Sequence, residues 1–365
     1  MRGAAPVNAP GARRRVAVLG ATGAVGQAFV RLLAGHPWFE LAELAASGRS
    51  AGRAYLEATR WIGDAPPAEV AGMTVLPADP EAVSADILFS ALDASVAGEI
   101  EIAFASAGRM VLSNARNHRL DDDVPLVIPE VNPDHLALLD VQRERRGWPA
   151  GGGIVTNANC AAIVAVMALA PLHQRFGLRQ LFIATMQAVS GAGYPGVASL
   201  DILGNVIPFI DGEEPKIERE TAKLLGTLDG GRVVPAPIGI SVHANRVPVE
   251  HGHTICISVG LERRASAADA LDALREWRGA EAARGLPSAP SLPLRVSDEP
   301  DRPQPRRDVW SEGGMQVVIG RVRNDPVLDL RLVAMGHNVV RGAAGASVLN
   351  AELLMAHHAQ RLARP

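Results

Sequence analysis

Short apolar runs alternate with amphipathic stretches through the first part of the chain. Strand-like runs rich in β-branched and other apolar residues occur at RVAVLG, FELAELAAS, ADILFSAL, MVLSNA and VPLVIPEV, with a minor one at TVLP. Between them, GQAFVRLLAGH and ASVAGEIEIAFASAG place apolar residues at helical spacing. Strands that alternate with helices in this way predict a parallel, doubly wound sheet.

The pattern changes beyond residue 156, where longer strand-like runs dominate. After a helix that begins near Cys160, these runs are RQLFIATMQAV, VVPAPIGISVHANRVPV, GHTICISVG, MQVVIGRVRND and LDLRLVAMG. SAADALDALREWRGAEAA and the final AAGASVLNAELLMAHHAQRLA are helical, and the proline-rich GLPSAPSLPLRVSDEPDRPQPRRD predicts a surface loop. Mostly β structure with segregated helices predicts an α+β domain with a large, mostly antiparallel sheet.

These patterns divide the chain into an α/β domain of the doubly wound Rossmann type and a second, α+β domain. We expect a mobile tail over residues 1–12, the first domain over 13–155 and the second over 156–339. The C-terminal helix, within 340–365, is expected to pack back on the first domain. The length of 365 residues and the 48% hydrophobic content suit two packed cores.

Composition and charge exclude several classes of partner. The net charge is only -3 and the cations are spread along the chain, so neither nucleic acid nor an anionic membrane is expected as a partner. Two cysteines cannot form a disulfide framework, which fits a reducing compartment. The basic N-terminus lacks the apolar segment of a signal peptide, and the apolar run after Cys160 ends too early to span a bilayer. We therefore expect a cytoplasmic protein, without a metal site.

A glycine-rich loop, GATGAVG, follows the first predicted strand and opens the first helix. Glycines there permit a tight turn and the close approach of a pyrophosphate, which then lies at the helix N-terminus. A tight turn without a ligand is the alternative, but the position directly after the first strand favours a dinucleotide. The predicted cofactor-binding residues of this loop are Gly20, Thr22, Gly23, Ala24, Val25 and Gly26.

The end of the second predicted strand indicates which dinucleotide binds. An NAD enzyme places Asp or Glu there to hold the ribose 2′-hydroxyl. This chain has Ser47, Arg49 and Ser50 instead, and two hydroxyls with a guanidinium suit a 2′-phosphate. The sequence therefore favours NADP.

The stretch VTNANCAAIVAVMALA places Cys160 at the front of a predicted helix, at the junction of the two domains. A helix N-terminus lowers the pKa of a thiol, and Asn159 can cap this helix. The backbone N–H groups there are natural donors to an oxyanion. A small buried residue is the alternative, but the neighbouring asparagine amides would then need partners. The pattern favours a nucleophile.

A thiolate catalyst needs a proton shuttle, and ten histidines are candidates. The most suggestive stretch is HANRVPVEHGHT, which contains Arg246, Glu250, His251 and His253. Pro248 and Gly252 disturb strand alternation there, so spacing does not decide which histidine serves.

Two further stretches have open interpretations. MQAVSGAGYPG is a strand that runs into a glycine loop, which either approaches a cofactor or simply turns a corner. EEPKIERETAKLLG places Glu213 and Lys216 at the start of a helix, where a charge run is more often a solvated face than a site.

Taken together, these motifs closely resemble the aspartate-semialdehyde dehydrogenases, specifically their archaeal and fungal branch. The similarity runs from Val16 to Leu354 and includes GATGAVGQ, SNARNHRLDDDVPLVIPEVNPDHL, IVTNANC, QAVSGAGYPG, IPFIDGEEPKIERETAKLLG, NRVPVEHGHT and GHNVVRGAAGASVLNAE. So many motifs in the same order make the resemblance specific.

The resemblance implies a role for several residues. Cys160 falls on the family's nucleophile, His253 on its acid–base residue and Gln187 on the glutamine that orients the thioester. Arg246 matches the arginine that binds the substrate carboxylate, and Glu213 matches the acid that meets the amino group.

The phosphate and nicotinamide sites follow from the same resemblance. Lys216, Arg119 and Asn117 fall on the substrate side, where the phosphate binds. Asn338 falls where the family holds the nicotinamide carboxamide, and Ser190 and Gly191 line the same region.

Four positions depart from the family pattern. Ala158 and Ala161 flank the NC step, where TNPNCS or TNPNCT is usual. Arg116 adds a cation in SNAR, and Asp93 replaces an expected proline in FSALDAS. These changes bear on nucleotide and phosphate binding more than on the reaction.

The implied reaction is the NADPH-dependent conversion of 4-phospho-L-aspartate to L-aspartate 4-semialdehyde through a thioacyl enzyme. A malonyl-CoA reductase or an N-acetyl-glutamyl-phosphate reductase of the same fold would share the core motifs. A non-catalytic NADP-binding regulatory protein is a third alternative, although it would have no use for a nucleophile. The second domain is expected to form a homodimer or homotetramer.

Overall fold

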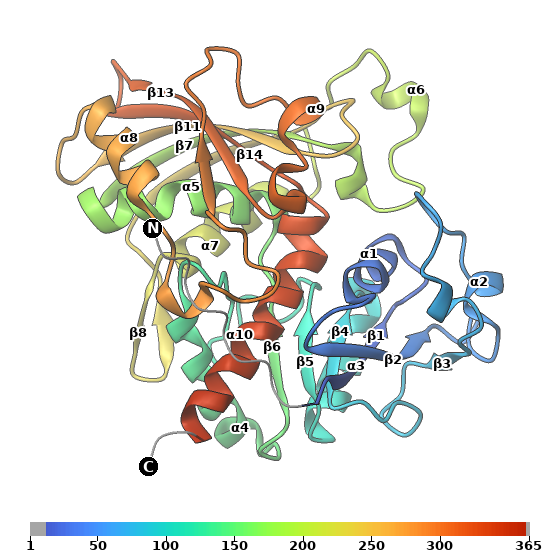
Figure 1. The fold of residues 1–365 in the computed structure, drawn as a ribbon. Coiled ribbons are helices and arrows are strands. Elements are labelled where there is room, and N and C mark those ends of the chain that lie inside the picture. The colour runs from blue at the N-terminus through green and yellow to red at the C-terminus, as the bar shows by residue number, and fades with distance from the viewer. Residues whose placement is uncertain (1–11, 363–365) are drawn as a thin grey trace.

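The computed structural model describes residues 12–362, with side chains through His357 (Figure 1). The predicted mobile tail therefore lies almost entirely outside the described residues. Two six-stranded sheets occupy separate halves of the molecule. This arrangement confirms the predicted fold class, a doubly wound sheet joined to an α+β part.

The first sheet is entirely parallel and has the strand order β3-β2-β1-β4-β5-β6. Its strands are β1 (Arg14–Leu19), β2 (Phe39–Ala46), β3 (Val75–Pro77), β4 (Ile87–Ser90), β5 (Met110–Ser113) and β6 (Gly153–Thr156). The helices around it are α1 (Ala24–Leu33), α2 (Tyr55–Ala58), α3 (Ala94–Ser106) and α4 (Leu138–Arg146).

Apolar packing on both sides of β1 explains why its residues 16–19 form an unbroken apolar run. Val16 and Val18 belong to the core that contains residues of α1 and of the C-terminal helix. Ala17 and Leu19 belong to a separate core that contains residues of α3. A parallel strand covered by helices on both faces has no solvent-facing positions.

The prediction of a strand at VPLVIPEV is wrong. Residues 124–131 form only an isolated bridge, Leu126 with Thr156, and the sixth strand is β6. Pro125 and Pro129 have no N–H groups for a ladder. Asn132 instead folds the segment into a turn, because its side chain accepts from the Ile128 N–H and donates to the Leu126 carbonyl.

The second sheet is mixed, with the order β10-β7-β11-β14-β13-β12. Its strands are β7 (Leu178–Gln187), β10 (Gly239–Arg246), β11 (His253–Leu261), β12 (Leu294–Val296), β13 (Val317–Asn324) and β14 (Leu330–Gly336). The three central pairings are antiparallel and the two outer ones are parallel. The helices are α5 (Cys160–Phe176), α6 (Ser199–Ile202), α7 (Glu213–Leu224), α8 (Ala267–Glu276) and α9 (Pro305–Asp308), and β8 (Thr227–Asp229) pairs with β9 (Arg232–Val234).

One face of this sheet is covered and the other is open. Ile183, Val242 and Ile255 point into the core that the buried side of α5 completes. Alternate positions on the same strands, such as Phe182 and Cys256, are exposed. The covered face carries α5, and Cys160 lies at the start of that helix.

Three sequence-based element boundaries need correction. The run VVPAPIGISVHANRVPV is not one strand, because Pro235 and Pro237 separate β9 from β10. The helix expected over SAADALDALREWRGAEAA ends at Glu276. The proline-rich segment expected as a loop also contains the short elements β12 and α9.

The C-terminal helix α10 (Gly345–Leu362) runs down the centre of the molecule, coloured red in Figure 1. It contacts α1 and β5 of the first half. Because the two sheets are separate and α10 packs on the first half, we propose domain boundaries at residues 155/156 and 339/340. Among the described helices, none is long and apolar enough to cross a membrane.

Candidate active site

The thiol of Cys160 lies at the start of α5, with its Sγ 3.1 Å from His253 Nε2. Asn159 caps the helix as expected, because its Oδ1 accepts from the N–H groups of Ala161 and Ala162. Gly342 packs directly against Cys160, and a Cβ at this position would lie 2.5 Å from the Cys160 Cβ. Backbone from the C-terminal region therefore closes one side of the site.

Two of the N–H groups at the helix start are already used by this cap. We expected backbone N–H groups at the helix start to serve as oxyanion donors. Those of Ala161 and Ala162 donate to Asn159 Oδ1, and for the Cys160 N–H the expectation stays a prediction. His253 Nε2 is the ring nitrogen that the structure places beside the sulfur.

Three strand ends bring the remaining catalytic candidates to the same edge of the second sheet. Gln187 ends β7 and pairs with Arg246, which ends the parallel strand β10. His253 begins β11, which runs antiparallel to β7, so it also lies at this edge. The sheet topology, rather than residue spacing, selects His253 over His251 as the partner of Cys160.

Burial dominates the electrostatics of the cysteine–histidine pair. It raises the pKa of the Cys160 thiol to about 12, and the nearby Glu213 carboxylate contributes in the same direction. Burial, followed by the charges of Arg246 and His337, lowers the pKa of His253 to about 3. These shifts favour a neutral thiol beside a neutral imidazole when no substrate is bound.

Glu213 is buried, although its charged stretch of sequence suggested a solvent-facing helix side. Its Oε1 accepts from Asn159 Nδ2 at 2.8 Å and from Gln187 Nε2 at 3.1 Å. Its Oε2 lies 3.4 Å from the Lys216 ammonium. The start of α7 therefore belongs to the site.

Arg119 has a partner that the sequence did not reveal. Its Nη1 lies 3.0 Å from Glu220 Oε1 in a buried ion pair, and its Nη2 donates to the Asn114 carbonyl. Glu220 Oε2 accepts from the Asn159 backbone N–H. Glu220 thus links a predicted phosphate-binding arginine to the turn before the nucleophile. Helical spacing from Glu213 could have indicated it, since residues seven apart lie on one face.

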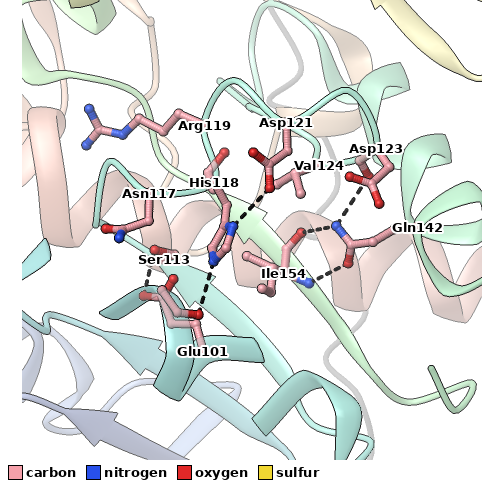
Figure 2. A network of polar contacts seen from close by, with 12 residues as sticks. Glu101, Ser113, Asn117, His118, Arg119, Asp121, Asp123, Val124, Gln142 and Ile154 are labelled. Carbon is pink, nitrogen blue, oxygen red and sulfur yellow. Dashed lines mark hydrogen bonds and ion pairs between the residues drawn. The ribbon is translucent and has the colours of Figure 1, made fainter. Parts of the chain in front are cut away.

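The hydrogen bond of Asn117 is directed to α3, not to Arg119 or Glu220. Asn117 is exposed and donates to the Ala94 carbonyl at the start of α3, and Figure 2 shows it on the far side of His118 from Asp121. His118 itself bonds to Asp121 Oδ2 at 3.0 Å and lies 3.3 Å from the Gly98 carbonyl oxygen. This network fixes the loop that carries Arg119.

Two of the four departures from the family pattern are charged, Asp93 and Arg116, and two are buried, Ala158 and Ala161. Asp93 caps α3 by accepting from the N–H and hydroxyl of Ser95, and Ser95 followed by Arg116 keeps the pKa of this carboxyl low. Ala158 and Ala161 are buried in the core around α5. Asp93 and Arg116, the two charged departures, lie close enough to interact electrostatically.

The glycine loop fits a dinucleotide. Gly20 has φ +73°, and a Cβ on Gly26 would lie 2.2 Å from the Gly20 carbonyl oxygen, so both positions require glycine. Thr22 lies in the turn, Gly23 is the N-cap of α1, and Ala24 and Val25 are the first residues of this helix. At the end of β2, Ser47 and Arg49 are exposed, and Ser50 is half-buried. No carboxylate occupies residues 47–50, so the donor set suits a 2′-phosphate.

The predicted nicotinamide residues contact one another beside Cys160 and His253. Asn338 Oδ1 accepts from the Gly252 N–H, and its Nδ2 donates to Ser190 Oγ at 2.8 Å. A Cβ on Gly191 would lie 2.9 Å from Arg246 Nη1 and 3.1 Å from His253 Cε1. Ser190 therefore borders Asn338, and Gly191 borders His253 and Arg246.

Known proteins resemble this chain over most of its length. Residues 15–139 match the family model for the semialdehyde dehydrogenase NAD binding domain, and residues 169–341 match the semialdehyde dehydrogenase dimerisation domain. The chain is 50% identical over 344 residues to an aspartate-semialdehyde dehydrogenase of Archaeoglobus fulgidus, covering 94% of this chain and 98% of the relative. It is 48% identical over 350 residues to that of Trichophyton rubrum, covering 93% and 96%.

Solved structures show the same similarity. The aspartate-semialdehyde dehydrogenase of Candida albicans, solved with NADP, superposes with a TM-score of 0.88 at 42% identity, covering 95% of this chain and 99% of that one. A second enzyme, from Vibrio cholerae, gives a TM-score of 0.74 at 27% identity, covering 94% and 98%. The fold, the site and these similarities together show that the chain belongs to the aspartate-semialdehyde dehydrogenase family.

Proposed function

We propose that this protein catalyses the NADPH-dependent reductive dephosphorylation of 4-phospho-L-aspartate to L-aspartate 4-semialdehyde. The observation that carries the proposal is the approach of Cys160 Sγ to His253 Nε2 at 3.1 Å, beside Gln187, Arg246 and Glu213. The names of the relatives support the substrate.

Cys160 acts as the nucleophile. Its sulfur attacks the acyl carbon, phosphate leaves, and a thioacyl enzyme remains. His253 Nε2 lies beside the sulfur, where it can donate to the oxygen of the tetrahedral intermediate. Gln187 is held in place by its hydrogen bond to Glu213. We assign Lys216 and Arg119 to the phosphate, with Asn117 at the outer edge of that site.

The charged groups around the sulfur select the rest of the substrate. Arg246 is buried with one nitrogen donating to the Ala188 carbonyl, and its remaining N–H groups are assigned to the α-carboxylate. Glu213 is assigned to the amino group. This pairing of a cation and an anion favours an amino acid over the thioester of a CoA substrate.

The glycine loop and residues 47–50 would hold NADP, and Asn338, Ser190 and Gly191 would border its nicotinamide. When bound, the reduced cofactor supplies the hydride that converts the thioacyl group to an aldehyde. The NADP-containing relative supports this assignment.

Arg49 should discriminate between the two nicotinamide cofactors. Replacing Arg49 with alanine is expected to raise the KM for NADPH roughly tenfold, because a charge-assisted hydrogen bond to the 2′-phosphate is lost. The KM for NADH, which lacks that phosphate, should change less than about twofold. Steady-state kinetics with both cofactors measures the difference. Arg53→Ala is the matched control, since Arg53 is also exposed but donates to the Glu57 carbonyl. An equal rise in both KM values would contradict the assignment.

An activity assay tests the reaction itself. Purified protein is given L-aspartate 4-semialdehyde, phosphate and NADP⁺, and separately malonyl-CoA or N-acetyl-glutamyl phosphate with NADPH. Absorbance of the reduced cofactor should change rapidly in the first assay only. Turnover confined to one of the other substrates would identify the alternative reductase, and none in any assay would favour a regulatory protein.

We further propose a cytoplasmic homo-oligomer, a dimer or a tetramer, that serves lysine, threonine and methionine biosynthesis. The match to a dimerisation domain supports the assembly. Exposed Phe182, Leu203 and Phe209 on that part of the chain are suitable for burial against a second copy.

A further inference from the structure

His251 is not the partner of Cys160, and its imidazole contacts the predicted nicotinamide site instead. Its Nδ1 lies 3.0 Å from Ser190 Oγ, and Asn338 Nδ2 donates to the same oxygen at 2.8 Å. Asn338 Oδ1 accepts from the backbone N–H of Gly252, the residue after His251. The contacts therefore form a closed ring that runs from His251 through Ser190 and Asn338 to Gly252.

One backbone group fixes the direction of the bonds in this ring. A backbone N–H only donates, so the Asn338 oxygen faces Gly252 and the Asn338 nitrogen donates to Ser190. The Ser190 hydroxyl keeps its own proton to donate, and the acceptor that the described contacts provide is His251 Nδ1. Burial lowers the pKa of His251, which favours the neutral ring. The Glu250 carboxylate, with Oε1 3.6 Å from Nε2, favours the ring proton on that nitrogen and leaves Nδ1 free to accept.

Ring contacts hold the imidazole of His251 in this orientation. It stacks on His337 with the ring centroids 4.8 Å apart, and both rings lie edge-on to Trp310. His337 is fixed in turn, because its Nδ1 accepts from two backbone N–H groups just beyond Asn338. His337 directly precedes Asn338 in the chain. The ring that supports His251 and the side chain assigned to the cofactor therefore belong to one segment.

We propose that His251 is a positioning residue for the nicotinamide end of the cofactor, and that it acts through the Ser190 hydroxyl on the amide of Asn338. This deepens the proposed function and rests on it for the placement of the nicotinamide at Asn338. Asn338 is buried, and one of the two hydrogens on its Nδ2 is used on Ser190. The other is the one left for the nicotinamide carboxamide. Fixing the first hydrogen fixes the direction of the second.

Replacing His251 with leucine removes the acceptor and keeps an apolar side chain against His337. We expect the Kd for NADPH to rise roughly fivefold, because the Ser190 hydroxyl loses its acceptor and Asn338 its fixed orientation. Adenosine 2′,5′-bisphosphate has the 2′-phosphate but no nicotinamide, so its Kd should change less than about twofold. Calorimetric titration of the full chain measures both. An equal loss for the two ligands would show a general structural role and overturn the proposal, as would an unchanged Kd for NADPH.

His251→Asn is the matched control. Asparagine has an accepting oxygen at the same number of bonds from the backbone as Nδ1, so the Kd for NADPH should stay within about twofold of the parent value. His251→Gln places its amide at the position of Nε2 instead. It should behave as His251→Leu does, and it takes over the test if the leucine variant fails to fold. A loss in His251→Asn as large as in His251→Leu would mean that the acceptor is irrelevant, and the proposal would fail.

Ser190→Ala tests the route by which His251 acts. In a chain that lacks the hydroxyl, adding His251→Leu should raise the Kd for NADPH no further, because the connection to Asn338 is already broken. Additive losses would overturn the proposal. These measurements use NADPH and no acyl substrate. If the protein failed to reduce 4-phospho-L-aspartate, the binding results would still decide the role of His251, so the two failures are separate results.

Discussion

Replacing Cys160 with alanine is expected to lower turnover by on the order of 10⁴-fold or more, because no other group supplies the S–C bond of the thioacyl route. Affinity for NADPH should remain within about twofold, since the glycine loop and residues 47–50 that would hold it lie in the first domain. Initial rates measure the first effect. Titration of cofactor fluorescence on binding measures the second.

The matched control is Cys256→Ala. Cys256 is exposed on β11, away from the α5 start, and its loss should leave the rate within about twofold. Mass spectrometry gives an independent readout, because 4-phospho-L-aspartate without cofactor should add one acyl group to the parent protein and to Cys256→Ala. Cys160→Ala should gain no such mass. Acylation or wild-type turnover of Cys160→Ala would exclude this nucleophile.

Local features were predictable wherever one residue and its neighbours decide the structure. The glycine loop needs glycine at Gly20 and Gly26 for steric reasons that the motif already expresses. Asn159 before an apolar helix is a cap by its chemistry, and the structure confirms that it bonds two helix N–H groups. Helix starts and tight βα turns are encoded over a few residues.

Contacts that depend on tertiary topology were not predictable from the residues alone. Spacing within HANRVPVEHGHT did not select His253, because the choice depends on β11 running antiparallel to β7. The hydrogen bond from the Ala188 N–H to His253 Nδ1 is invisible to any side-chain motif, and Glu220 pairs with Arg119, 101 positions away. VPLVIPEV had the composition of a strand, and only its prolines and the Asn132 turn prevented it from forming one.

Helix α7 connects these separate observations. Glu213, at the start of α7, accepts hydrogen bonds from Asn159 and Gln187. Glu220, seven residues later on the same face of the helix, accepts from Arg119. Lys223 donates to three carbonyl groups within residues 119–124. A single helix therefore holds the turn before Cys160 and the loop that carries Arg119 at a fixed distance from each other. A charge run that suggests a solvated face is, in three dimensions, the element that aligns the two halves of the site.

Replacing Arg341 with methionine is expected to lower the free energy of unfolding by about 3–5 kcal/mol, the typical cost of leaving a buried charge without its partner. Arg341 lies in the π-helical turn Val340–Ala344 and has no exposed surface. Its two terminal nitrogens bond to the two oxygens of buried Glu130 at 2.7 and 2.8 Å. The pair joins the turn behind Cys160 to the segment 124–131, so its loss should also loosen the site.

Urea unfolding followed by circular dichroism measures this cost as a shift of the midpoint. Adding Glu130→Gln to Arg341→Met should recover part of the loss, since the uncompensated charge is then gone. Arg175→Met is the matched surface control, because Arg175 pairs with Glu276 at 2.9 Å while both side chains are exposed, and it should cost less than about 1 kcal/mol. Equal costs for the two single substitutions would show that burial does not strengthen the Arg341–Glu130 pair, and that another contact must hold the turn against Cys160.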